Sequence, residues 1–265
     1  MKLFLFLTML MAAPGLPKLF RETYSFLPAQ SGAITPDGSG VYVCRTEVTN
    51  AEYNEFLFYM KRDAPDAYAS VLPDSTQWNN PKYCSFCEPL KTHYHAHPAY
   101  LPYPVVNVSR EAAEAYCTWL TEFNNSRGLF ANSEFEVVYR LPRRDEWMLA
   151  ARGGKADAQF AWESSRKTIK GREKGNYDTG TPAEALGDAN DYATFTAPAI
   201  SYVPNGYNLY NMSGNVAELL ANGEGVAGGS WRSPATATSI DAIEPYDGPA
   251  PTVGFRVVAE VRKRQ

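Results

Sequence analysis

The chain has 265 residues, a length that allows one large domain or two small ones, and its 25 basic and 29 acidic side chains give a net charge of −4. Its only run of three consecutive basic residues is Arg262-Lys263-Arg264, and with a net negative charge nucleic acid is not an expected partner. Hydrophobic residues make up 45% of the chain, which is enough for a sizeable core and argues against intrinsic disorder. Nineteen glycines, nineteen prolines and 13% aromatic residues predict a loop-rich fold without long helices.

The N-terminus has the pattern of a secretory signal peptide. Lys2 precedes an apolar run, Leu3 to Ala13, which has the length of a signal-peptide core and is too short to span a membrane. We therefore expect residues 1–13 to be a signal peptide, with the cleavage site left open because residues 11–14 match the cleavage pattern poorly. The alternative is a short apolar strand or helix. No other stretch approaches the ~20 apolar residues of a transmembrane helix.

Capping residues predict where the first two helices begin. A strand over 41–48, rich in β-forming residues, is followed by Thr49-Asn-Ala-Glu52, the sequence of a capping box, and by apolar residues at helical spacing up to Met60. Ser109 is a second N-cap residue, and the apolar stripe behind it ends before Asn124 to Gly128. These patterns predict helices from about residues 50 and 110.

The second half of the chain predicts less regular structure. A strand is expected over 135–141, and Pro142 is placed to open a third helix that ends at Gly153-Gly154. From there to about Tyr210 no helical or strand period is sustained, which suggests that something other than secondary structure, such as a bound metal, orders the segment. Short strands return over 226–231 and 254–261.

Seven segments, in this order, resemble the family of formylglycine-generating enzymes and sulfatase-modifying factors. They are Thr46-Glu-Val-Thr-Asn-Ala-Glu-Tyr53, Tyr103-Pro-Val-Val-Asn-Val-Ser109, Tyr139-Arg-Leu-Pro142 with Asp145-Glu-Trp147, Ala150-Ala-Arg-Gly-Gly154, Pro204-Asn-Gly-Tyr-Asn-Leu-Tyr-Asn-Met-Ser-Gly-Asn-Val-Ala-Glu218, Gly228-Gly-Ser-Trp231 and Val253-Gly-Phe-Arg-Val257. The resemblance implies an α+β, modified C-type-lectin-like fold with little regular secondary structure, and a single domain over residues 20–265.

An insert in the chain resembles a narrower group. Segments from Leu72 to Leu90 and from His97 to Val106 look like the gliding-motility and type IX secretion lipoproteins of the J and K type. This resemblance implies a place among the non-catalytic members of the family on the periplasmic side of the envelope. Those relatives carry a lipid-modified cysteine, and no cysteine follows the apolar run here.

The reactive thiols of the family are not matched. In its catalytic members, a cysteine pair shortly after the Gly-Gly-Ser-aromatic motif binds Cu(I), an ion that soft thiolates select. Ser233 and Thr238 stand at those positions, and a neutral hydroxyl does not replace a thiolate. Copper is therefore not an expected cofactor, no catalytic residue is assigned, and Ser230 is interpreted as a turn residue.

Calcium is the metal that the resemblance implies. One site maps onto Asn211, the carbonyls of Gly214 and Val216, and Glu218, all oxygen ligands of the kind that a hard cation prefers. A second, more loosely aligned site maps onto a set in the irregular stretch: Asn176, the carbonyl of Tyr177, Asp191 and the carbonyl of Ala193. The alternative interpretation is that these side chains only form hydrogen bonds within loops.

One cluster of soft ligands is unexplained by the family. Cys84 and Cys87 precede His93, His95 and His97, the only three histidines, and two thiolates with two imidazoles suit tetrahedral zinc. The spacing from Cys87 to His93 is shorter than in zinc fingers. A disulfide between the two cysteines, if the protein is exported, and two free packed thiols are the alternatives.

Three function classes follow from the sequence. The leading hypothesis is a non-catalytic, exported scaffold or binding protein of a cell-envelope assembly, with protein partners. The second is an oxygen-dependent modifying enzyme with an atypical metal site. The third is lectin-like ligand binding through loops 160–200 and 232–252.

Overall fold

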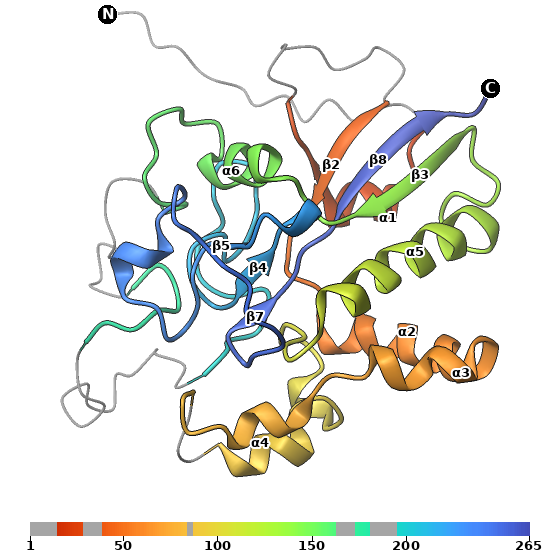
Figure 1. Ribbon diagram of the computed structural model, residues 1–265. Helices are drawn as coiled ribbons and strands as arrows, with labels where there is room; N and C mark the ends of the chain where they lie inside the picture. The colour runs from red at the N-terminus through yellow and green to blue at the C-terminus, as the bar shows by residue number, and fades with distance from the viewer. Residues whose placement is uncertain (1–14, 29–38, 84–86, 163–172, 181–194) are drawn as a thin grey trace, which may run out of the picture.

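The computed structural model describes residues 15–28, 39–83, 87–162, 173–180 and 195–265 (Figure 1). Its strands form two four-stranded sheets, ordered β1-β2-β8-β3 and β6-β5-β4-β7. The first sheet is antiparallel and contains β1 (Tyr24–Phe26), β2 (Gly40–Cys44), β3 (Phe135–Arg140) and β8 (Val258–Lys263). The second contains β4 (Ala217–Leu219), β5 (Val226–Ala227), β6 (Ile243–Glu244) and β7 (Val253–Gly254), and β7 runs parallel to β4.

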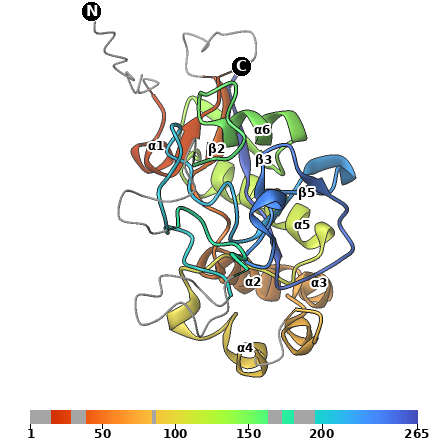
Figure 2. The same ribbon diagram turned by 90° about the vertical axis from the view of Figure 1, so that its left-hand side faces the viewer.

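Helices cover both faces of the first sheet, as the two views in Figures 1 and 2 show. On one face α2 (Asn50–Asp63) and α5 (Arg110–Ser126) share a core with Tyr42, Tyr139 and Ala259, which lie side by side in the strand register. On the other face α6 (Arg144–Arg152) packs against Val43 and Val258. The remaining helices are short: α1 (Lys18–Thr23), α3 (Pro65–Tyr68) and α4 (Glu88–His93).

The predicted helix starts are confirmed for α2 and α5. The Thr49 hydroxyl accepts a hydrogen bond from the backbone N–H of Glu52, whose carboxylate accepts one from the Thr49 backbone, so the capping box is complete. Ser109 accepts from the backbone N–H of Ala112 at 3.1 Å. Each cap satisfies N–H groups that the first turn leaves unpaired, which stabilises a helix by about 1 kcal/mol.

Three expectations for the elements were wrong. The composition predicted no long helices, but α5 has 17 residues. Composition is an average over the whole chain, so it does not reveal a single long amphipathic stripe. The third helix begins at Arg144 rather than Pro142, although Gly153 ends it in the left-handed conformation as predicted (φ 57°). The expected strand over 254–261 is instead β7 and β8, and residues 255–257 carry the chain from one sheet to the other.

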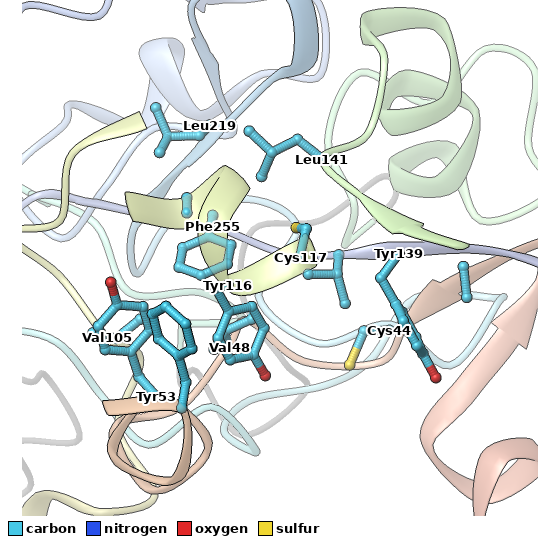
Figure 3. Packing of buried hydrophobic residues seen from close by; sticks show 14 of the residues in the cluster. Cys44, Val48, Tyr53, Val105, Tyr116, Cys117, Tyr139, Leu141, Leu219 and Phe255 are labelled. Carbon is cyan, nitrogen blue, oxygen red and sulfur yellow. The ribbon is translucent and has the colours of Figure 1, made fainter. Parts of the chain in front are cut away.

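The core in Figure 3 is built around aromatic rings from α2, α5 and the 255–257 crossing. Tyr53, Tyr116 and Phe255 are buried and contact one another, with ring centroids 5.5–6.3 Å apart. Cys44 and Cys117 lie in the same core as free, buried thiols. Burial raises the pKa of the Cys44 thiol to about 11, so this sulfur is an inert packing group.

The insert and the irregular stretch lie around the second sheet. Trp78, from the 3₁₀ helix Ser75–Asn79, packs with Tyr94 beside Trp231, and in Figure 1 α4 lies at the far end of the molecule from β3. In the described part of residues 155–210 no helix or strand occurs. No helix within the described residues is long and apolar enough to cross a membrane. The predicted signal peptide, residues 1–13, lies outside them.

Candidate functional site

The first predicted calcium segment folds into a tight, glycine-dependent turn. Asn211 (φ 55°), Gly214 (φ 89°) and Asn215 (φ 68°) all adopt left-handed backbone conformations. A Cβ atom on Gly214 would lie 2.3 Å from the backbone oxygen of Asn176, so only glycine fits there. The turn therefore presses directly against the segment that carries the second predicted site.

Asn215 holds these two segments together. Its backbone N–H donates to the Asn176 oxygen at 2.7 Å, and its side-chain oxygen accepts from the Asn176 amide at 3.2 Å and from the Ala197 N–H at 2.7 Å. Its own amide donates to Glu47 at 2.8 Å. Asn215 is completely buried, so these bonds replace every contact with water that the side chain loses on folding.

Glu47 lies under the turn as a buried carboxylate. One of its oxygens accepts from Asn215 and the other from the Asn211 amide at 3.2 Å. Burial raises the pKa of Glu47 to about 7; Arg256 opposes the rise and Glu218 adds to it. The Asn211 amide also donates to the Ala199 carbonyl, whereas its oxygen Oδ1 is buried without a hydrogen-bond partner.

Glu218 forms a buried ion pair with Arg256. The two side chains are 1% and 0% exposed, and three N···O contacts of 2.7–3.2 Å join them. The Trp147 indole N–H donates to the same carboxylate at 2.7 Å. Arg256 also donates to the carbonyls of Cys44 and Tyr210. Burial disfavours the charged guanidinium, but the contact with Glu218 outweighs it and the pKa of Arg256 is raised. We call Glu47, Asn176, Asn211, Asn215, Glu218 and Arg256 the buried polar network.

The network fits a bound cation only in part. Asn211 Oδ1 is an orphaned buried oxygen, as expected of a ligand to a hard cation. Both oxygens of Glu218, however, already bind Arg256 and Trp147. The negative charge of Glu218, which was expected to balance a calcium ion, therefore balances the guanidinium of Arg256 instead. Calcium binding at Asn211, Gly214, Val216 and Glu218 stays a prediction.

Half of the second predicted calcium site can be described. The Asn176 amide donates to the Phe195 carbonyl at 2.8 Å, and the Tyr177 hydroxyl bonds to Glu173. Asp191 and Ala193 lie outside the described residues, so this site also stays a prediction.

The loop after Gly228-Gly229-Ser230-Trp231 satisfies its own hydroxyls. Ser233 Oγ accepts from the Ser230 backbone N–H at 2.9 Å, and Thr238 Oγ1 donates to the Ala235 carbonyl at 2.8 Å. Thr238 is fully buried at the end of the 3₁₀ helix Ala235–Thr238. The insert reaches this loop, because the Arg232 guanidinium donates to the Tyr83 carbonyl.

The cysteine–histidine cluster does not converge in the described residues. Cys87 is disulfide-bonded, so it offers no thiolate, and Cys84 lies outside the described residues. His93 is exposed at the end of α4, whereas His95 points to Asn50, with Nδ1 at 3.2 Å from Oδ1. Burial lowers the pKa of His95 to about 4. Among the described residues no group of three histidine, cysteine or acidic side chains could hold a metal ion.

A family model described as the sulfatase-modifying factor enzyme 1-like domain matches residues 34–261. The chain belongs to this family. It is 38% identical over 149 residues to the formylglycine-generating enzyme of Thermomonospora curvata, a match that covers 56% of this chain and 42% of that protein. It is 32% identical over 124 residues to inactive C-alpha-formylglycine-generating enzyme 2 of Bos taurus, covering 46% of this chain and 34% of that protein. These matches span less than half of either relative's length.

The fold of a sulfatase-modifying-factor domain is confirmed by solved structures. The crystal structure of CarF superposes with a TM-score of 0.53 at 20% identity, covering 91% of this chain and 93% of that chain. At this identity the likeness concerns the fold alone. The predicted α+β, C-type-lectin-like class is therefore confirmed.

Three residues of the network were missed by sequence reasoning: Glu47, Asn215 and Arg256. Each lies inside a family motif, so the motif was found but the role was not. A signal exists for Arg256, because a charged residue inside the apolar run from Val253 to Ala259 needs a buried partner of opposite charge. Glu47, between Thr46 and Val48 next to a strand, carries the same signal more weakly.

Proposed function

We propose that the protein is a non-catalytic family member that acts as an exported scaffold or binding component of a cell-envelope assembly. The observation that carries this proposal is the pair of hydroxyls, Ser233 and Thr238, at the positions that resemble the copper-binding thiols. An alcohol stays protonated at neutral pH and is a poor ligand for soft Cu(I). Both hydroxyls are also engaged in hydrogen bonds within their own loop.

Two independent features support the export part of the proposal. The N-terminal sequence, Lys2 followed by Leu3 to Ala13, has the order of charge and apolar residues found in signal peptides. Cys87 is disulfide-bonded, and disulfides persist mainly in oxidising compartments such as the periplasm. The likeness of the insert to gliding-motility and type IX secretion proteins supports an envelope assembly as the setting.

Calcium is proposed as a structural ion rather than as a catalyst. The support is Asn211 Oδ1, a buried acceptor that lacks a partner at the predicted site. When bound, calcium would hold the turn over 211–218 by its carbonyl and amide oxygens. The chain's own residues already join the turn to Glu47 and Asn176.

The catalytic alternative is tested by an aldehyde assay. We expect the purified protein, supplied with Cu(I) and oxygen, to leave a sulfatase-type cysteine peptide unconverted. The double variant Ser233→Cys/Thr238→Cys should gain about one equivalent of tightly held Cu(I). The matched control Ser230→Cys/Ser239→Cys places thiols on the same loop and should not. Peptide conversion by the wild type above a metal-only control contradicts the proposal.

The setting is tested separately on the native protein. N-terminal sequencing should find a chain that begins after about residue 13, in the periplasmic or envelope fraction. An intact Met1 in the cytoplasmic fraction contradicts export but leaves the non-catalytic assignment standing.

A further inference from the structure

The short connection between β4 and β5 carries an exposed Asn-Gly pair. Asn222 (φ 55°) and Gly223 (φ 73°) both adopt left-handed backbone conformations, and the Glu224 N–H donates to the Ala221 carbonyl at 3.1 Å across them. Two consecutive left-handed residues closed by such a bond form a type I′ turn, for which Asn-Gly is a preferred sequence. Because glycine has no Cβ, its backbone nitrogen can also approach the side-chain amide of the preceding asparagine.

Nothing in the described part of the chain engages the tip of this turn. Asn222 and Gly223 are exposed, no hydrogen bond within the described residues involves the Asn222 side chain, and a Cβ on Gly223 would meet no atom within 4 Å. The base of the turn is fixed instead. The Leu220 N–H donates to the Gly225 carbonyl at 3.0 Å, and the Arg110 guanidinium donates to the carbonyls of both residues. The tip can therefore open while the strands on either side stay paired.

A second Asn-Gly pair, Asn205-Gly206, is held firmly by its surroundings. The Asn205 amide donates to two carbonyls of α6, and its oxygen accepts from two backbone N–H groups of its own turn, all at 2.8–3.1 Å. The Gly206 nitrogen lies so close to Gly153 that a Cβ on Gly153 would be 2.7 Å from it. Neither the amide nor this nitrogen can move without breaking contacts with α6.

We propose that Asn222 is a site of spontaneous deamidation, a covalent modification from which the fold protects Asn205. The Gly223 backbone nitrogen attacks Cγ of Asn222 and forms a five-membered succinimide, and the side-chain nitrogen leaves as ammonia with the proton of the Gly223 N–H. Water then opens the ring at either carbonyl, which gives aspartate or isoaspartate at position 222. Ring closure requires rotation about the Cα–C bond of Asn222, so the reaction proceeds from the opened turn.

The modification changes both the charge and the backbone of a turn that contacts α6. Either product adds a negative charge two positions from Glu224, whose carboxylate accepts a hydrogen bond from the Arg144 N–H at 2.9 Å. Isoaspartate also routes the main chain through the former side chain, which adds one methylene to a turn whose two central residues set the register of the β4–β5 hairpin. The reaction needs only water, so it is independent of whether the protein is a scaffold or a catalyst.

Peptide mapping of the folded protein, aged in mildly alkaline buffer, tests the proposal. Trypsin leaves both Asn-Gly pairs on one fragment, 175–232, so chymotrypsin, which cuts after Tyr210, is used to separate them. We expect Asn222 to be converted at least about tenfold faster than Asn205, because reaction at Asn205 requires local unfolding. Buffer made with oxygen-18 water should place one heavy oxygen in each product. In urea, which removes the folded contacts, the two rates should become similar.

A variant of the attacking residue tests the chemistry. Gly223→Ala places a methyl group beside the nitrogen and should slow conversion of Asn222 several-fold, and the open space around this position accommodates the methyl group. Gly248→Ala is the matched control, because Gly248 is also left-handed (φ 118°) with no atom within 4 Å of an added Cβ. This variant should leave the rate at Asn222 unchanged. Melting curves confirm that both variants fold.

Two results overturn the inference. One is an unmodified Asn222 in the folded protein after the same ageing in urea has converted it. The other is conversion of Asn205 as fast as that of Asn222 in the folded protein, which would mean that the fold does not select the site. Both results leave the proposed function intact, because that function is tested by the aldehyde assay on the unaged protein.

Discussion

The buried polar network and the loop after Trp231 differ in how far along the chain their side-chain hydrogen bonds reach. In the network, Glu47 bonds to Asn211 and Asn215, more than 160 positions away. In the loop, Ser230 bonds to Ser233, and Thr238 to Ala235, three positions away. The side chains of the network join distant segments, whereas the hydroxyls of the loop bond only within the loop, which contacts the rest of the chain through other groups, such as Arg232 with Tyr83 and the Ser233 carbonyl with Asp178.

This difference indicates which parts of the family framework can change freely. Replacing a network residue leaves a buried charge or amide without its partner, which costs several kcal/mol. A thiol and a hydroxyl are of similar size, and the loop satisfies its hydroxyls locally. We therefore expect that exchanging thiols for hydroxyls at Ser233 and Thr238 changes the stability of the fold little.

The largest effect should come from breaking the Glu218–Arg256 pair. Arg256→Met leaves Glu218 buried with only the Trp147 N–H as a partner, so the free energy of unfolding should fall by about 3–5 kcal/mol. Urea unfolding measures this loss. The control is Lys263→Met, which removes one partner of a half-exposed pair with Glu134 and should change stability by about 0.5 kcal/mol or less.

If the single variant yields no folded protein, Arg256→Met combined with Glu218→Gln removes both charges and should recover part of the stability. If Arg256→Met lowered the free energy of unfolding by less than about 1 kcal/mol, the ion pair between β4 and the crossing segment would not contribute substantially to stability.

The sequence predicts the local features of this fold well. Thr49 and Ser109 cap their helices as expected, and Gly153 ends α6, because these signals act within one turn of backbone. The family motifs predict the fold class, but the resemblance assigned Asn176 and Asn211 to two separate calcium sites, whereas the structure brings both into one hydrogen-bonded network. What residues do across distant segments is harder to predict.

Glu218 illustrates that limit. Its motif predicts a calcium ligand, but its nearest charge is Arg256, from the crossing between the sheets that was expected to be one strand. In a strand over 254–261 successive side chains alternate between two faces, so Arg256 was expected on the face opposite Phe255 and Val257. Both faces are in fact covered there, so period-two patterning fails. Only the three-dimensional path of the chain reveals the pair.

A second prediction concerns the pH dependence of the network. Glu47 has its pKa raised to about 7 by burial, above its ordinary value of 4.5, so the folded state binds its proton more tightly than the unfolded state. Its contribution to stability is present below about pH 4.5 and is lost as the pH rises through 7. The loss should be on the order of 3 kcal/mol.

Urea midpoints at pH 5, 6 and 7 in EDTA should therefore fall, and Glu47→Gln should remove most of that slope. The variant can stay folded, because Asn211 can turn its amide so that the unpaired Oδ1 accepts from the new amide group. Glu136→Gln, an exposed acid on β3, should keep the wild-type slope. An unchanged slope in Glu47→Gln would assign the pH dependence to other groups.

Calcium should act through Asn211 rather than through charge on Glu218. At a calcium concentration a hundredfold above Kd, binding adds about 2.7 kcal/mol to the free energy of unfolding. Asn211→Ala removes the orphaned oxygen and should abolish the difference between calcium and EDTA in thermal melts. Asn208→Ala is the control, since Asn208 is an exposed asparagine with a similar left-handed backbone (φ 61°). Equal melting temperatures of the wild type with calcium and with EDTA would exclude a structural calcium site.

The smallest effect should come from the loop itself. Thr238→Val keeps the shape of a fully buried side chain and removes one hydrogen bond to Ala235, a loss of about 1 kcal/mol, because the carbonyl is left without that donor. Ser233→Ala removes the acceptor for the Ser230 N–H, in a half-buried turn that water can reach, and should cost less. The two sites lie on one loop, so the double variant and both single variants are needed to test additivity. If the double variant lost as much stability as Arg256→Met, the loop would be part of the framework that holds the fold together, and the residues at positions 233 and 238 could not change freely.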